Sequence, residues 1–445
     1  MDYNEIIKDC PLISAIEDEV NKQTVRFHMP GHKGQEFPFV NNRFDFTEYS
    51  QTDNLYCPEG AILRAEQKAA LAFGSGATLF CAGGATLALQ ACVMYAKRLS
   101  DTTGRCVLVD RLCHKSVFNA LMLCDIQPVW FLPDDENAVS VIQQLKPCVV
   151  IITDIDYYGK FRLSRELAMA AKQCGGVLIC DNSHGTHLAF CQNGLHYPLT
   201  LGADISVDSA HKTTPALTGG AFINVSRETC ASAEKIRKFM EVFGSSSPSY
   251  LIMQSLDWSR AYMQRFATQK LCELEKHIDN IRKLATDKGF CVFDKQTHDV
   301  FRLTIGTENV DISGNQLYSL LLQNGIVCEM CDQTCVVLIC TVCDDKQMYD
   351  KLYKCIESIS CKKTHKKTDI ISKPTIPDLA MPPKRALFST NCQTVNLINA
   401  IGKISAEIYA PYPPGIPLIM PGEVFNNNVI EGLTPYYTEV KVIIQ

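Results

Sequence analysis

The sequence lacks an excess of charge of one sign. Its 43 Lys and Arg residues and 48 Asp and Glu residues give a net charge of -5 at pH 7. Nucleic-acid binding needs many cationic side chains facing phosphates, so the missing basic excess argues against a nucleic-acid partner. With 46% hydrophobic residues, the composition is typical of a globular protein.

The sequence also lacks the long apolar runs that membranes require. No stretch reaches the ~18 consecutive apolar residues of a membrane-spanning helix. The segment Met1–Lys8 carries charges where a secretory signal peptide would have its apolar core. We therefore expect a cytoplasmic protein that makes no membrane contact.

The 22 cysteines indicate reduced core residues rather than a disulfide framework. A chain of 445 residues is long enough to bury its core in two or three domains, and it shows no export signal. The pairs Cys328–Cys331 and Cys340–Cys343 mimic the four thiolates of a structural zinc site. Only eight residues separate the pairs, and the alternating Val, Ile and Leu around them favour a β-hairpin. We expect no metal.

Apolar runs of strand length alternate with helical patterns from about residue 60 to residue 255. This alternation predicts an α/β fold with a mainly parallel, seven-stranded sheet covered on both faces. Such sheets bind ligands beyond the carboxyl ends of their strands. The predicted strands are residues 78–81, 106–109, 128–132, 149–153, 177–180, 205–207 and 221–225.

The sequence divides into five segments. A long helical pattern from about residue 250 links the large domain to a smaller α/β domain. The Lys-rich run at residues 362–368 is short and has no interleaved aromatic residues, so it predicts a solvated linker rather than a nucleic-acid patch. The predicted segments are an N-terminal arm (1–59), the large domain with its linker helix (60–285), a small domain (286–361), a linker (362–383) and a C-terminal segment (384–445).

Two ionisable residues follow predicted strands at the positions where a ligand would bind. Lys212 comes shortly after one apolar run, and Asp181 directly ends another. Pyridoxal phosphate chemistry needs this pair, because a lysine amine attaches the cofactor and an anion keeps its pyridine nitrogen protonated. The pair predicts a pyridoxal-phosphate site with Lys212 and Asp181 as its catalytic residues.

A glycine-rich turn supplies a candidate phosphate cradle. Residues 83–86 lie between a predicted strand and a predicted helix. Glycines allow the backbone to approach an anion closely, and the N-terminus of a helix favours negative charge. The candidates for this phosphate site are Gly84, Ala85, Thr86, Ser209 and His211.

A series of motifs runs from near the N-terminus to near the C-terminus. They are Arg26-Phe-His-Met-Pro-Gly-His-Lys33, Thr52-Asp-Asn-Leu-Tyr-Cys-Pro-Glu-Gly-Ala61, Cys81-Ala-Gly-Gly-Ala-Thr86, His114-Lys-Ser116, Asp181-Asn-Ser-His-Gly185, Ser209-Ala-His-Lys212 and Tyr412-Pro-Pro-Gly-Ile-Pro417 with Pro421-Gly-Glu423. In these motifs the chain resembles the Orn/Lys/Arg decarboxylase family. The Pro-Gly-His-Lys and Tyr-Pro-Pro-Gly-Ile-Pro runs are specific to that family.

The resemblance implies a pyridoxal-phosphate enzyme of fold type I. It would convert arginine, lysine or ornithine to the corresponding amine and CO2. It resembles the compact form of the family, without the N-terminal receiver-like domain that some members carry. The resemblance also implies an obligate homodimer or larger homo-oligomer whose pocket is shared between subunits, with residues 28–33 and 245–249 serving the partner's cofactor.

The resemblance adds two histidines to the site. His114 matches the family histidine that stacks over the cofactor ring, and His184 matches a position where the family places an aromatic residue or a histidine near the cofactor. We therefore expect His114 and His184 to join Lys212 and Asp181 as catalytic residues.

Carboxylates should bind the distal cation of the substrate, because a buried charge without a partner is costly. The candidates all lie in family-like motifs, and they are Glu48, Asp53, Glu59 and Glu423.

Three departures from the family pattern leave alternatives open. Asn182 stands where the family often has Glu, Ala85 where Thr or Ser is more usual, and residues 153–159 lack the usual Pro before Tyr-Tyr-Gly. Another fold type I reaction, such as aminotransfer or β-elimination, would use the same lysine and aspartate. A non-catalytic regulatory homologue is the third alternative. The pathway served by the amine, polyamine biosynthesis or acid resistance, also stays open.

Overall fold

The large sheet has seven strands in the order β1-β7-β6-β5-β4-β2-β3. Residues 3–22, 25–37, 41–191, 194–364, 376–411 and 415–444 are described by the structure, a computed structural model. Strands β3, β2, β4, β5 and β6 are parallel, whereas β7 is antiparallel to both β6 and β1. The predicted α/β fold with a mainly parallel, seven-stranded sheet is confirmed. The strands are β1 (Ala77–Cys81), β2 (Val107–Asp110), β3 (Val129–Phe131), β4 (Val149–Thr153), β5 (Val177–Asp181), β6 (Ile205–Asp208) and β7 (Ala221–Val225).

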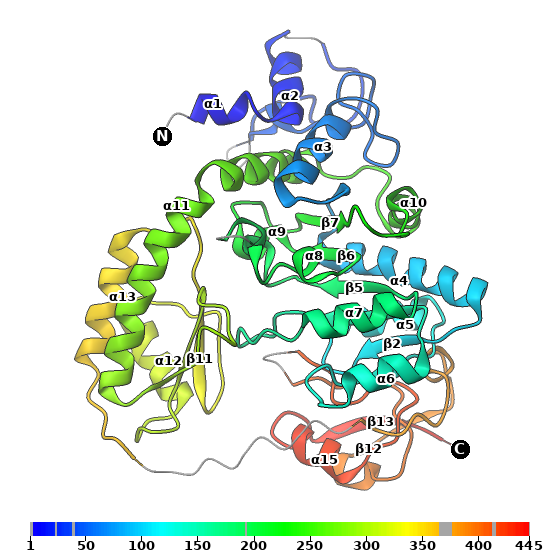
Figure 1. Ribbon diagram of the computed structural model, residues 1–445, viewed down its shortest axis with the longest axis vertical. Coiled ribbons are helices and arrows are strands. Elements are labelled where there is room, and N and C mark those ends of the chain that lie inside the picture. The colour runs from blue at the N-terminus through cyan, green and yellow to red at the C-terminus, as the bar shows by residue number, and fades with distance from the viewer. Residues whose placement is uncertain are drawn as a thin grey trace.

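Helices cover both faces of this sheet (Figure 1). Several of them begin with a side-chain cap. The hydroxyls of Ser164, Ser232 and Ser249 accept hydrogen bonds from the first turns of α7, α10 and α11. The helices are α1 (Tyr3–Ile7), α2 (Pro11–Asn21), η1 (Asn42–Phe44), α3 (Ala61–Phe73), α4 (Gly84–Thr103), α5 (Lys115–Leu123), α6 (Ala138–Leu145), α7 (Arg165–Gln173), η2 (Thr186–Phe190), α8 (Pro198–Leu201), α9 (Ala210–Thr213), α10 (Ala233–Phe243), α11 (Tyr250–Lys288), α12 (Gly314–Gln323), α13 (Lys346–Ser358), α14 (Pro383–Leu387), η4 (Leu397–Ala400) and α15 (Asn427–Leu433).

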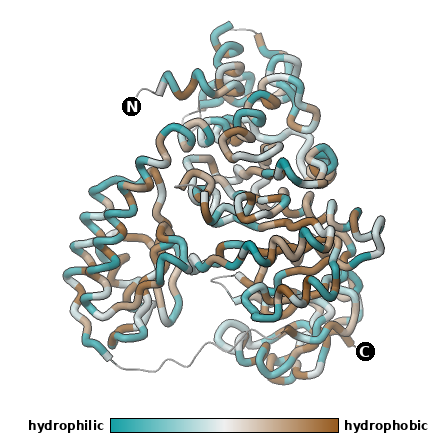
Figure 2. The backbone as a smooth tube through the Cα atoms, in the orientation of Figure 1, coloured by the Kyte–Doolittle hydropathy of each residue, from teal (hydrophilic) through white to brown (hydrophobic). Residues whose placement is uncertain are grey.

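Neighbouring residues of each central strand belong to different cores. In β4, Val149 and Ile151 pack into the core on the α4 side, and Val150 and Ile152 into the core under α6 and α7. A strand buried on both faces must be apolar throughout rather than alternating, which is why these runs were readable in the sequence. Figure 2 shows the same concentration of hydrophobic residues in the central strands.

A second sheet lies at the far end of the long helix α11 (Figure 1). Its order is β10-β11-β9-β8, all antiparallel, with bounds β8 (Cys291–Val292), β9 (Arg302–Gly306), β10 (Met330–Cys331) and β11 (Cys335–Ile339). The hairpin β10–β11 confirms the β-hairpin predicted around the clustered cysteines. None of the 22 cysteines, all of which lie within the described residues, forms a disulfide. Within the described residues, no group of three or more His, Cys, Asp and Glu side chains is arranged to hold a metal ion.

The C-terminal residues form a small unit around the sheet of β12 (Cys392–Asn396) and β13 (Glu439–Ile443). Residues 412–414 of the Tyr-Pro-Pro-Gly-Ile-Pro motif and residues 365–375 of the predicted linker lie outside the described residues. None of the helices that the structure describes combines the length and the hydropathy needed to cross a bilayer.

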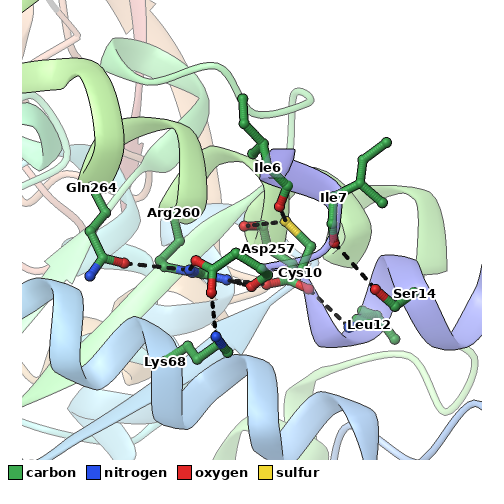
Figure 3. Close-up of polar contacts among 10 residues, drawn as sticks. Ile6, Ile7, Cys10, Leu12, Ser14, Lys68, Asp257, Arg260 and Gln264 are labelled. Carbon is green, nitrogen blue, oxygen red and sulfur yellow. Dashed lines mark hydrogen bonds and ion pairs between the residues drawn. The ribbon is translucent and has the colours of Figure 1, made fainter. Parts of the chain in front are cut away.

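An ion-pair network around the buried residues Asp257 and Arg260 fastens the N-terminal helices to the first turns of α11 (Figure 3). The Leu12 backbone N–H donates to Asp257 Oδ2 at 2.9 Å, and Arg260 Nη2 donates to Asp257 Oδ1 at 2.9 Å. Asp9 completes the network by pairing with both Arg260 and Lys68. Burial raises the pKa of the Asp257 carboxyl, and the charge of Arg260 opposes that shift. Arg260 is therefore the cation that allows Asp257 to be buried.

Replacing Arg260 with Met should lower the free energy of unfolding by about 3–5 kcal/mol, because Asp257 would stay buried without its cation. Urea denaturation measures this loss. The control is Lys346→Met, which breaks an exposed pair with Asp350 on α13 and should change stability by no more than about 0.5 kcal/mol. Similar losses in the two variants would contradict the role given to Arg260.

Candidate active site

A cavity of about 270 Å³ lies at the carboxyl edge of the large sheet. Asp181 ends β5, and Lys212 lies in the short helix α9 directly after β6. Because β5 and β6 are parallel neighbours, their carboxyl ends meet at this edge. All nine residues predicted for catalysis and cofactor binding line the cavity: Gly84, Ala85, Thr86, His114, Asp181, His184, Ser209, His211 and Lys212.

Lys212 is half-buried, and its Nζ lies 3.1 Å from His184 Nε2. Burial lowers the pKa of the Lys212 amine, and the positive charge of Arg302 lowers it further. The charges of Asp181 and Glu329 act in the opposite direction. A lowered pKa increases the fraction of free amine, the form that is nucleophilic.

His184 is buried between Lys212 and a residue of the second sheet. Its Nδ1 lies 2.6 Å from Arg302 Nη2, and its ring centroid lies 4.8 Å from that of Tyr157. Burial, followed by the charges of Arg302 and Lys212, places the pKa of His184 well below its usual range. The imidazole is therefore neutral at physiological pH.

Asp181 is a buried carboxylate held in one orientation by Ser183. Its Oδ1 accepts hydrogen bonds from the Ser183 hydroxyl at 2.5 Å and from the Ser183 backbone N–H at 3.1 Å. Its negative charge raises the pKa values of His114 and Lys212, which line the same cavity. Asp181 is thus a fixed carboxylate on the wall of the cavity, which Asp156 also lines.

His114 caps the N-terminus of α5 with its ring. Its Nδ1 accepts from the Ser116 backbone N–H at 3.2 Å, so the proton of the neutral ring sits on Nε2. The Ser116 hydroxyl lies 2.9 Å from the same nitrogen. Burial lowers the pKa of His114, which keeps its face uncharged.

The 20-residue helix α4 begins at the cavity with Gly84. Gly84 has a φ of +69° and donates its N–H to the Gly219 carbonyl at 2.7 Å, a conformation that favours glycine. This turn brings the first backbone groups of the helix, at Ala85 and Thr86, to the cavity wall. The positive end of the helix dipole faces the cavity there.

Two charged residues near the site were missed from the sequence. Arg302 is buried in β9 although it sits inside an apolar run, and a charge in such a run is the signal that could have marked it. Glu329 directly precedes β10, and its charge raises the pKa of both Lys212 and Arg302. Nothing in the local sequence distinguishes Glu329 from an ordinary surface carboxylate.

The four carboxylates proposed for the substrate's distal cation do not line the cavity of the single chain. Asp53 accepts backbone N–H groups at the start of α3, including that of Gly60 at 2.8 Å. Glu423 is buried against Arg111 at 3.2 Å. Glu48 accepts a hydrogen bond from a neighbouring threonine, and Glu59 borders a separate cavity. These contacts account for Asp53 and Glu423 without a substrate, and the four residues stay a prediction as substrate ligands.

Models of one protein family match most of the chain. The model for "Orn/Lys/Arg decarboxylase, major domain" matches residues 10–150 and 140–305, and the model for "Orn/Lys/Arg decarboxylase, C-terminal domain" matches residues 365–437. The uncharacterized protein YaaO of Bacillus subtilis is 29% identical over 95% of this chain and 93% of its own. The arginine decarboxylase of the same organism is 26% identical over 95% of this chain and 92% of its own.

Solved structures show the same fold. The lysine decarboxylase LdcF of Francisella novicida superposes with a TM-score of 0.78 over 98% of this chain and 81% of its own, at 17% identity. A structure of SPT with a PLP internal aldimine superposes with a TM-score of 0.56 over 79% of this chain and 84% of its own, at 14% identity. The fold is therefore that of the fold type I pyridoxal-phosphate-dependent enzymes. The chain belongs to the Orn/Lys/Arg decarboxylase family, as its motifs predicted.

The structure explains one departure from the family pattern. Asn182 Nδ2 donates to Asp208 Oδ1 at 2.6 Å, and Asn224 Nδ2 donates to Asp208 Oδ2 at 2.9 Å. Burial raises the pKa of Asp208 to about 6 despite these bonds. A glutamate at position 182 would set a second carboxyl against Asp208 in a buried site, whereas the amide supplies a donor.

Replacing Asn182 with Asp should destabilise the protein more as the pH rises. Two buried carboxyls in contact share a proton, so their pKa in the folded state is raised above that of the unfolded chain. The folded state then binds more protons, and stability is lost as the pH rises through the folded-state pKa. A shift of about two pKa units would cost roughly 3 kcal/mol at pH 8 and much less at pH 5.

Urea denaturation at the two pH values measures this difference. The control is Asn428→Asp, the same change at an exposed position of α15, which should give the same stability change at both pH values. A loss in Asn182→Asp that does not depend on pH would show that the new carboxyl does not face Asp208.

Proposed function

We propose that the protein uses pyridoxal phosphate to decarboxylate a basic amino acid, arginine, lysine or ornithine, to the corresponding amine and CO2. The observation that carries the proposal is the meeting of Lys212, Asp181 and the N-terminus of α4 at one cavity. Family membership supports the reaction class, and the likeness to SPT in fold supports the cofactor.

The residues present fit this cofactor. The backbone N–H groups at Ala85 and Thr86 would hold the phosphate at the helix N-terminus. The Lys212 amine would attach the aldehyde, and the Asp181 carboxylate would hold a proton on the pyridine nitrogen. The neutral ring of His114 would cover one face. When bound, the cofactor supplies an electron sink for the pair released with CO2.

The cavity walls favour loss of a carboxylate. Leu112, Ile155 and Ile416 give the cavity apolar surface beside its polar groups. A carboxylate held against such surface is poorly solvated, whereas neutral CO2 loses little by leaving water. Lys212 lines the same cavity, and in its protonated form Nζ would supply the proton that the product takes up in place of the carboxylate.

Glu329 is our candidate for the anion that binds the substrate's distal cation. Its side chain is exposed and therefore free to meet a ligand, and like the four carboxylates above it does not line the cavity of the single chain. It is also close enough for its charge to act on Lys212 and Arg302. A single carboxylate of this kind suits an ammonium or a guanidinium group.

We further propose a cytoplasmic homodimer or larger homo-oligomer. The support is the N-terminal arm, where Val25, Phe27 and Met29 are exposed and Phe27 is 92% accessible in the single chain. Exposed apolar side chains clustered in one segment are typical of an interface. The arm would then contribute to the partner's site.

The reaction is tested by supplying pyridoxal phosphate with an equimolar mixture of arginine, lysine and ornithine, and identifying the products by mass spectrometry. We expect agmatine, cadaverine or putrescine as products. In Lys212→Ala the rate should fall by at least about 10⁴-fold, because the attachment point would be lost. Lys346→Ala, an exposed lysine of α13, is the control and should keep full activity. Keto acids, or no amine from protein that holds the cofactor, would point to aminotransfer, elimination or a regulatory role.

Replacing Glu329 with Gln should raise the KM for the basic substrate about tenfold and leave kcat nearly unchanged, because binding of the distal cation is equal in ground and transition states. Steady-state kinetics measure both constants. Glu357→Gln, an equal charge change at an exposed site on α13, should leave KM unaltered. A fall in kcat at constant KM would contradict a role in substrate binding.

A further inference from the structure

A line of three nitrogen-bearing side chains connects the second sheet to the candidate attachment lysine. Arg302 Nη2 lies 2.6 Å from His184 Nδ1, and His184 Nε2 lies 3.1 Å from Lys212 Nζ. Arg302 and His184 are buried, and Lys212 is half-buried.

The direction of these two hydrogen bonds follows from what each group is able to donate. A guanidinium has only donors, so His184 Nδ1 must accept the bond from Arg302. The proton of the neutral imidazole is therefore on Nε2, which then donates to Lys212. An ammonium has no lone pair with which to accept, so Lys212 Nζ is the neutral amine in this arrangement.

The surroundings hold Arg302 in place for this contact. Gly159, with a φ of +97°, leaves room for its stem, because a Cβ there would lie 2.8 Å from Arg302 Cβ. Asp299, whose Oδ2 is 3.2 Å from His187 Nε2, compensates the buried charge by raising the pKa of Arg302 against the effect of burial. Arg302 Nη1 has no hydrogen-bond partner among the described residues. The hydrogen bond from Nη2 to His184 is therefore the polar contact that orients the guanidinium.

We propose that Arg302 is a positioning residue: it fixes His184 in the Nε2–H tautomer and through it holds Lys212 as the neutral, nucleophilic amine. The inference rests on the proposed function only in taking Lys212 as the point where the cofactor attaches. The second sheet thereby sets the protonation state of a lysine carried by the first.

The other charged and titratable groups near Lys212 do not supply this control. Asp181 and Glu329 raise the pKa of the lysine and so favour its charged form. His114 and His211 each have a lowered pKa, caused first by burial, and are neutral at physiological pH. Among the described groups that act on the lysine, Arg302 is the one whose charge and hydrogen bond both favour the free amine.

The tautomer is measured directly in the unmodified, cofactor-free protein by ¹⁵N NMR after histidine labelling. His184→Phe identifies the His184 signals by their loss. We expect an unprotonated Nδ1 and a protonated Nε2. A protonated Nδ1, or a doubly protonated ring at pH 7, would overturn the proposal whatever the enzymatic activity.

The effect on Lys212 is measured by the pH dependence of its acetylation in cofactor-free protein, followed by peptide mass spectrometry. Arg302→Gln should raise the apparent pKa of Lys212 by about one unit, so that about tenfold less free amine is present below that pKa. Arg302→Lys keeps a charged donor and should restore most of the native reactivity.

A double-mutant comparison separates the hydrogen-bonded path from the direct charge effect. In a His184→Phe background the ring stays but cannot relay a hydrogen bond, so Arg302→Gln should shift the Lys212 pKa by less than half as much. An equal shift in both backgrounds would show that Arg302 acts through space alone, and the proposal would fall. Because these labelling experiments use neither cofactor nor substrate, their failure is distinguishable from failure of the proposed reaction.

Discussion

The site depends on how the protein stabilises the buried carboxylates that lie at the carboxyl ends of its parallel strands. Asp110 ends β2, Asp154 follows β4, Asp181 ends β5 and Asp208 ends β6. All four are buried, and a buried carboxylate must find a cation, find donors or take up a proton. Arg162 Nη2 donates to Asp110 at 3.0 Å.

Asp154 and Asp208, at the same edge, are stabilised without a cation of this kind. Burial raises the pKa of Asp154 to about 7, which leaves it largely protonated below that pH. Amide donors from Asn182 and Asn224 satisfy Asp208. Of these four carboxylates Asp181 borders the cavity, together with Asp156 from the segment after β4. Lys212 therefore shares its cavity with the carboxylate of Asp181, the arrangement that the proposed cofactor needs.

Groups from distant parts of the chain act on the cavity or line it. Arg302 in β9 and Glu329 directly before β10 lie outside the cavity lining and act on Lys212 through His184 and through space. The C-terminal unit reaches the opposite wall with Ile416, and Arg111 holds the adjoining segment by donating to the Pro417 carbonyl at 2.7 Å. The electrostatics of the cavity therefore depend on how three parts of the fold pack together.

The sequence was most informative where local pattern and position decide the structure. Strands buried on both faces are continuous apolar runs, so the seven strands were placed to within about two residues, and Lys212 and Asp181 followed from where those runs end. The sequence did not reveal the residues that long-range packing brings to the site. Arg302 lies 118 residues from His184, the residue that it contacts. The sequence also did not reveal that the Asp53 oxygens accept the backbone N–H groups of Glu59 and Gly60.

Our proposal makes Lys212 the residue to which the cofactor attaches, at the carboxyl edge of the sheet. The most direct measurement is borohydride reduction of the protein mixed with pyridoxal phosphate, followed by peptide mapping. We expect a single pyridoxyl group on the peptide that contains Lys212, because the Lys212 amine lies in the cavity and has a lowered pKa. A label spread over exposed lysines, or found at another single lysine, would contradict it.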